Sequence, residues 1–183
     1  MVNPWLLYQR YGDRRVLEEH YGTMSRYVVY LGSQAKGHIV AHGLGDWYDI
    51  GPGGPGESKL TTKGLTATAI YYHDVDILRQ VAALLGKRDD AQRYARLARE
   101  IRDAFNARFF HPQANQYDRA SQTANAMPLV LGLVEPGNEV AVLASLVKDV
   151  RSRGNQVFEA ADRVVWSVKL QDQLQSYSGV PGK

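Results

Sequence analysis

Residues 65–78 read Leu65-Thr-Ala-Thr-Ala-Ile-Tyr-Tyr-His-Asp-Val-Asp-Ile-Leu78, and this stretch decides the fold. Apolar and small side chains occur around most of the circumference that a helix would have here. A helix that is apolar on most sides is buried on most sides. Thr61 or Thr62 is a suitable N-cap and Gly86 a suitable stop. We therefore expect a buried helix from Thr62 to about Leu85.

Helical periodicity continues on both sides of this central helix. The clearest amphipathic segment runs from Asp90 to Phe109, with arginines on one side and apolar residues on the other. Further helices are expected over the following ranges: Pro4–Tyr11, Asp13–Gly32, Ser121–Leu133, Val140–Arg153 and Ala160–Tyr177. Asp13 and Asp89 are expected N-caps, and Pro128 predicts a kink or a late start of its helix. No alternating run is long enough to predict a strand. The expected fold class is all-α, with antiparallel helix pairs in one domain of residues 1–183.

A long loop is expected at residues 33–61, where glycine and proline are too dense for a helix or a central strand. Loops of this length in compact domains are usually functional or disordered. This loop carries Trp47 and Tyr48 between Asp46 and Asp49, and His42 precedes them. An aromatic ring can stack on the C–H face of a sugar while carboxylates accept bonds from its hydroxyls. We interpret these five residues as substrate-binding candidates. The alternative is that Trp47 pins the loop to the core and Asp46 caps a turn.

The composition excludes several classes of partner. The chain has 183 residues, 44% of them hydrophobic and 22% charged, with a net charge of +3 and no cysteine. The small net charge, without a run of five basic residues, argues against nucleic acid or an anionic membrane as the main partner. No apolar run approaches the length of a membrane span, and no cleavable signal segment is recognisable at the N-terminus. Disulfides and thiolate chemistry are excluded.

The order of several segments resembles that of the bacterial α-L-rhamnosidases of glycoside hydrolase family 78. The resemblance covers about residues 4–156. It rests on an ordered set of motifs: Tyr11-Gly12-Asp13, Val16-Leu17-Glu18-Glu19-His20-Tyr21, Gly43-Leu44-Gly45-Asp46-Trp47, Leu65-Thr66-Ala67-Thr68-Ala69 with Tyr71-Tyr72, Leu85-Gly86-Lys87 with Asp90-Ala91, Ala104-Phe105-Asn106, Ser121-Gln122-Thr123, Leu131-Gly132-Leu133-Val134 and Arg153-Gly154-Asn155.

This resemblance implies part of an (α/α)6 toroid that hydrolyses terminal α-L-rhamnose with inversion and without a cofactor. An inverting pair of carboxyl groups is spaced to admit a water. In the family the proton donor precedes the matched region and the base follows it, so the catalytic residues are unknown here. By resemblance, Asp46 and Trp47 match the Asp-Trp that contacts substrate. The expected partner is a rhamnose-containing carbohydrate.

The chain departs from the family pattern after Asn155, and residues 157–183 form a divergent C-terminal segment. With the missing upstream part, this predicts a fragment that is inactive alone and able to self-associate. The resemblance also implies that the parent enzyme is periplasmic or secreted. Two other functions remain open, namely another sugar enzyme on the same toroid and a non-catalytic helical scaffold that binds carbohydrate or protein.

Weaker site candidates lie outside the Asp-Trp pair. Glu57 is the other acid of the loop and is either a solvated charge or a catalytic group. Gln122 and Thr123 are expected at a helix start and are candidates for lining the site. His20 and His73 lie within expected helices and are expected at the edge of the core. A metal role is disfavoured, because no ligands spaced for a metal accompany them.

Overall fold

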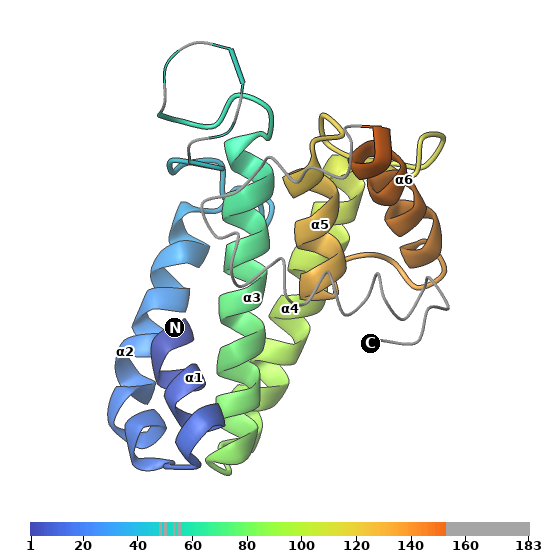
Figure 1. Ribbon diagram of the computed structural model, residues 1–183. Helices are drawn as coiled ribbons and strands as arrows, with labels where there is room; N and C mark the ends of the chain where they lie inside the picture. The colour runs from blue at the N-terminus through green and yellow to red at the C-terminus, as the bar shows by residue number, and fades with distance from the viewer. Residues whose placement is uncertain (48, 50, 53, 55, 153–183) are drawn as a thin grey trace. The chain divides into compact units, whose positions relative to one another are not determined.

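The computed structural model describes residues 1–152 apart from residues 48, 50, 53 and 55. Its elements follow in chain order: α1 (Val2–Tyr11), α2 (Arg15–Gln34), α3 (Lys63–Leu84), α4 (Arg88–Phe109), β1 (Phe110–His111), β2 (Gln116–Tyr117), α5 (Gln122–Leu131) and α6 (Glu139–Ser152) (Figure 1). The expected all-α class is confirmed. The helix expected at 160–177 and the divergent segment 157–183 lie outside the described residues.

The chain forms two compact units, which are taken separately below. Unit 1 comprises residues 1–41 and 67–107, and unit 2 comprises residues 42–66 and 108–183. Unit 1 contains α1, α2 and most of α3 and α4, whereas unit 2 contains the long loop from His42 onward, the β1–β2 hairpin, α5 and α6. No helix in the described parts of either unit is long and apolar enough to cross a membrane.

The core of unit 1 forms around α3. Tyr71, Val75, Leu78 and Val81 are almost fully buried, and the residues between them are buried or partly buried. The expectation of a helix buried on most sides is therefore correct. Side chains of α1, α2 and α4 complete this apolar cluster, of which Leu17 on α2 is a central member.

The ends of the helices agree with the capping rules at some positions and differ at others. Thr62 Oγ1 accepts a hydrogen bond from the Leu65 N–H at 3.4 Å, so Thr62 is the residue that caps α3. Asp13 is not the N-cap of α2, because Arg14 holds that position and Asp13 pairs with Arg15 instead. Asp89 is not the N-cap of α4 either, because the helix already begins at Arg88; Asp89 lies in the first turn, where a carboxylate interacts favourably with the helix dipole.

Unit 2 contains a hairpin that the periodicity did not reveal. β1 and β2 pair antiparallel through Phe110–Tyr117 and His111–Gln116, and strands of two residues are too short to show alternation. α5 begins at Gln122 and contains Pro128, so the alternative of a late start was wrong. Leu143 and Leu146 of α6 pack against apolar side chains of α5 and α6.

Candidate functional site

The long loop of unit 2 is closed by the carboxylate of Asp49. Its Oδ2 accepts the backbone N–H groups of Lys59 at 2.6 Å and Leu60 at 2.7 Å, and its Oδ1 accepts that of Gly51 at 3.1 Å. Burial acts to raise the pKa of Asp49, but these backbone N–H groups outweigh it and hold the pKa below its usual value. Asp49 therefore fastens the two arms of the loop together as an ionised group.

Two glycines allow the arms of the loop to approach this closely. A Cβ on Gly45, whose φ is +77°, would lie 2.5 Å from Ser58 Cβ. A Cβ on Gly51 would lie 2.6 Å from Lys59 Cβ. Contacts this short require glycine at both positions, so the glycine content that predicted a loop also sets its shape.

Asp46 connects the loop to the start of α5. It is 5% exposed, and its Oδ2 accepts a hydrogen bond from Thr123 Oγ1 at 2.6 Å. A second contact beside it joins Thr61 Oγ1 and Ser121 Oγ at 2.6 Å. The loop is thus held at Asp46 and at Thr61 by residues around the N-terminus of α5.

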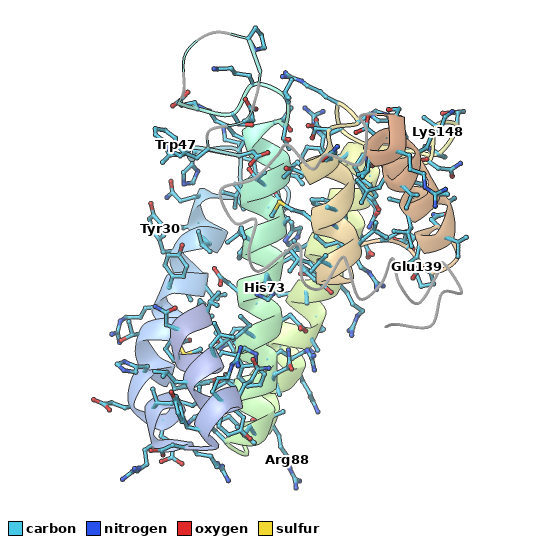
Figure 2. All side chains as sticks on the ribbon, viewed as in Figure 1. Tyr30, Trp47, His73, Arg88, Glu139 and Lys148 are labelled. Atoms are coloured by element: carbon cyan, nitrogen blue, oxygen red, sulfur yellow. The ribbon has the colours of Figure 1, made fainter. Side chains whose placement is uncertain are left out.

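Trp47 follows this anchored aspartate and is 38% exposed. Figure 2 shows the Trp47 side chain projecting from the loop. The interpretation that Trp47 is only a pin into the core is therefore less favoured, because a large part of its surface faces outward. A half-exposed indole beside a fixed carboxylate is a combination suited to binding a sugar ring.

The other substrate-binding candidates of the loop differ in exposure and in hydrogen bonding. His42 is exposed, and Tyr48 lies outside the described residues. Asp49 is committed to holding the loop closed, as described above. Glu57 is exposed and pairs with Lys63, which supports the interpretation of a solvated charge.

The residues expected to line the site from α5 are buried and hydrogen-bonded. Gln122 and Thr123 are 4% and 6% exposed, and Gln122 Nε2 donates to Asp149 Oδ2 at 2.9 Å. Sequence reasoning missed Asp118, whose carboxylate accepts bonds from the N–H and hydroxyl of Thr62 at 2.7 and 3.0 Å. No local motif could reveal this pair, because 56 positions separate the two residues.

The remaining candidates do not form a metal site. His20 is exposed on α2 rather than at the edge of the core, and His73 is partly buried on α3. Across the part of the chain that the structure describes, no group of three or more His, Cys, Asp or Glu side chains could hold a metal ion.

The geometry of the loop favours binding over proton transfer. A general acid at neutral pH needs a raised pKa. Burial opposes ionisation of Asp49, yet the backbone bonds lower its pKa, so Asp49 is unsuited to that role. Asp46 and Trp47 together can position a ring and bind its hydroxyls.

Comparison with known proteins places these features in a family. The model of the bacterial alpha-L-rhamnosidase 6 hairpin glycosidase domain matches residues 1–161. An alpha-L-rhamnosidase of Alteromonas sp. (strain LOR) is 33% identical over 146 residues, which are 77% of this chain and 16% of that protein. The chain thus spans only a small part of the curated relatives that it matches.

Two solved structures show the same relationship. The alpha-L-rhamnosidase of Dictyoglumus thermophilum superposes with a TM-score of 0.83 at 38% identity, over 95% of this chain and 20% of that chain. The alpha-L-rhamnosidase of Streptomyces avermitilis, solved in complex with L-rhamnose, gives a TM-score of 0.76 at 29% identity, over 86% of this chain and 14% of that chain. The chain belongs to the bacterial α-L-rhamnosidase six-hairpin glycosidase family.

Proposed function

We propose that this chain is the segment of an α-L-rhamnosidase catalytic domain that supplies a sugar-binding loop. One observation carries the proposal: Asp46 is 5% exposed and fixed by Thr123, while the adjacent Trp47 keeps 38% of its surface exposed. A rigid anchor beside an accessible ring is the arrangement expected of a binding subsite. The substrate is then a carbohydrate that ends in α-L-rhamnose.

In this proposal the two side chains have different tasks. The indole of Trp47 stacks on the C–H face of the rhamnose ring. Asp46, which Thr123 holds in place, accepts a hydrogen bond from a sugar hydroxyl, since a carboxylate oxygen is a strong acceptor. Asp49 contributes indirectly by keeping the loop closed around them. The general acid and base of an inverting hydrolysis are supplied from outside these residues.

Replacement of Trp47 by alanine, in the enzyme that contains this chain, tests the subsite. The lost stacking is worth on the order of 1 kcal/mol, so KM for an aryl α-L-rhamnoside should rise about fivefold. Leu44→Ala is the matched control, because Leu44 is an exposed apolar residue of the same loop at 56% exposure. Unchanged kinetics in a folded Trp47→Ala enzyme would refute the assignment.

The second test uses the 183-residue chain alone. General acid and base assistance each contribute roughly 10²–10⁴-fold to such reactions. A chain without either group should hydrolyse an aryl α-L-rhamnoside at close to the uncatalysed rate. Robust turnover by the purified chain would show instead that an acid of the loop performs the chemistry, and it would contradict the proposed division of roles.

A further inference from the structure

A hollow of about 440 Å³ lies within unit 1, where α2, the turn after it, α3 and α4 meet. Pockets that bind small molecules usually measure about 300–1,000 Å³. Aliphatic side chains form its walls, among them Val28, Val29 and Leu97, whereas His38, Tyr71 and Arg93 contribute its polar atoms. Every lining residue belongs to unit 1, and none is part of the loop with Trp47.

The hydroxyl of Tyr71 is the polar group built into this hollow. Tyr71 is 2% exposed, and no hydrogen bond joins its Oη to any residue that the structure describes. Gly32 approaches this oxygen from α2, since a Cβ there would lie 3.1 Å from Tyr71 Oη. Burial, with the nearby charge of Glu100, raises the pKa of Tyr71, so the hydroxyl keeps its proton. Among the described residues only Arg102 Nε is fully buried without a partner, so Tyr71 Oη is open to the hollow and can donate to a ligand there.

Arg93 contributes further donors with little net charge. Its Nη2 donates to Asp90 Oδ1 and to Tyr94 Oη, both at 2.9 Å. A guanidinium has five N–H groups, so three are left without a partner among the described residues. Asp90 balances the charge of Arg93, and His38 Nε2 lies 3.9 Å from Glu100 Oε2. The hollow therefore offers hydrogen-bond donors but no excess positive charge to attract an anion.

The aromatic rings of the hollow do not offer a face to a sugar. Tyr71 and Tyr94 are each 2% exposed, and the guanidinium of Arg93 covers the Tyr94 ring at 4.8 Å from its centroid. Sugars are bound by exposed ring faces together with many polar groups. Aliphatic walls with a few donors suit a flat apolar ring that carries hydroxyl groups.

We propose that this hollow binds an uncharged hydroxylated aromatic compound, of the phenol class. Its ring lies among Val28, Val29 and Leu97, and one of its oxygens accepts the hydrogen bond that Tyr71 Oη donates. A second hydroxyl accepts from Arg93. Its lining residues are all different from those of the proposed rhamnose subsite, and the proposal does not depend on that subsite.

Titration of the 183-residue chain with 4-hydroxybenzyl alcohol, followed by calorimetry and by the NMR signals of the tyrosine rings, tests this proposal. We expect one molecule to bind per chain with millimolar affinity, as is usual for so small a ligand. Tyr71→Phe removes the donor and should weaken binding roughly 2- to 10-fold. Gly32→Ala places a methyl group against Tyr71 Oη and should weaken binding at least as much.

Gly22→Ala is the matched control on the same helix. Its Cβ would meet only Arg26 Nη1, at an ordinary 3.6 Å, so this variant should bind like the wild type. Circular dichroism melts establish that each variant is folded. The proposed site would be overturned if the wild type, Tyr71→Phe and Gly32→Ala all bound the compound with equal affinity. Absence of saturable binding would overturn it as well. So would a loss of affinity in Gly22→Ala as large as that in Gly32→Ala. Competition by L-rhamnose would identify a sugar site, and tighter binding of 4-hydroxybenzoate an anion site; either result would overturn the proposed ligand class.

Discussion

Asp74 should lower the stability of unit 1 at neutral pH, and its replacement by asparagine should raise it. The residue is 3% exposed on α3, and burial raises the pKa of Asp74 from the ordinary value of 3.8 to about 6, against a smaller opposing effect of the N-terminal ammonium. The folded state therefore binds a proton more tightly than the unfolded state. Linkage then requires that stability falls as pH rises between these two values.

The magnitude follows from the size of this pKa shift. Each unit corresponds to about 1.4 kcal/mol, so ionised Asp74 costs up to about 3 kcal/mol at pH 7. For a chain of this length, 1 kcal/mol changes Tm by about 2–4 °C, so Asp74→Asn should raise Tm by roughly 6–12 °C at pH 7. The gain should fall to about half at pH 5 and vanish near pH 3, because the wild-type carboxyl is then protonated.

Thermal melts by circular dichroism at these three pH values measure the effect. Asp103→Asn is the matched control, because Asp103 is exposed on the neighbouring helix α4 and its replacement should change stability by less than about 0.5 kcal/mol. A gain in Tm that is the same at all three pH values would refute the reasoning, because it could not arise from the ionisation of Asp74. A loss of Tm at pH 7 would show that the carboxylate is compensated in the folded chain.

Two further predictions concern the loop of unit 2. Thr123→Val removes the donor to the buried Asp46 carboxylate and should destabilise unit 2 by about 1–3 kcal/mol, measured by denaturant unfolding; an unchanged midpoint would contradict the role of this bond. The lowered pKa of Asp49 means that its contribution is present above the unfolded pKa and is lost as pH falls through the folded pKa. Amide exchange at Lys59 should accelerate on acidification in the wild type, whereas in Asp49→Asn it should be fast throughout; pH-independent protection would be evidence against the clamp.

The helices could be predicted from the sequence because the signals that define them are local. The predicted helix from Asp90 to Phe109 differs from α4 by two residues at its start, since its apolar stripe spans several turns. The β1–β2 hairpin could not be predicted, because two residues per strand show no period. Asn115 and Asp118, in and next to the hairpin turn, have positive φ, which asparagine and aspartate tolerate better than most residues. Single residues of these types are too common to predict a hairpin.

The sequence predicted which residues of the loop are site candidates, but not the hydrogen bonds that hold them in place. Trp47 and Asp46 stand out because an indole beside a carboxylate in a glycine-rich loop is unusual. The partner of Asp46 is Thr123, 77 positions away, and only the folded chain brings these residues together. The role of Asp49 could not be predicted either. Its carboxylate oxygens accept bonds from backbone N–H groups, and every residue except proline carries such a group.

The Asp49 clamp has a consequence for protein engineering. It joins position 49 to positions 59 and 60, so the segment between them is a ring that is closed at its base, where Gly51 is the residue whose identity matters. Lengthening such a ring costs little, about 0.6 kcal/mol for each doubling of its residues. A peptide tag or a small binding module inserted after Gly54 should therefore leave the base of the ring unchanged, which makes this position a natural attachment point on the loop of the proposed sugar subsite.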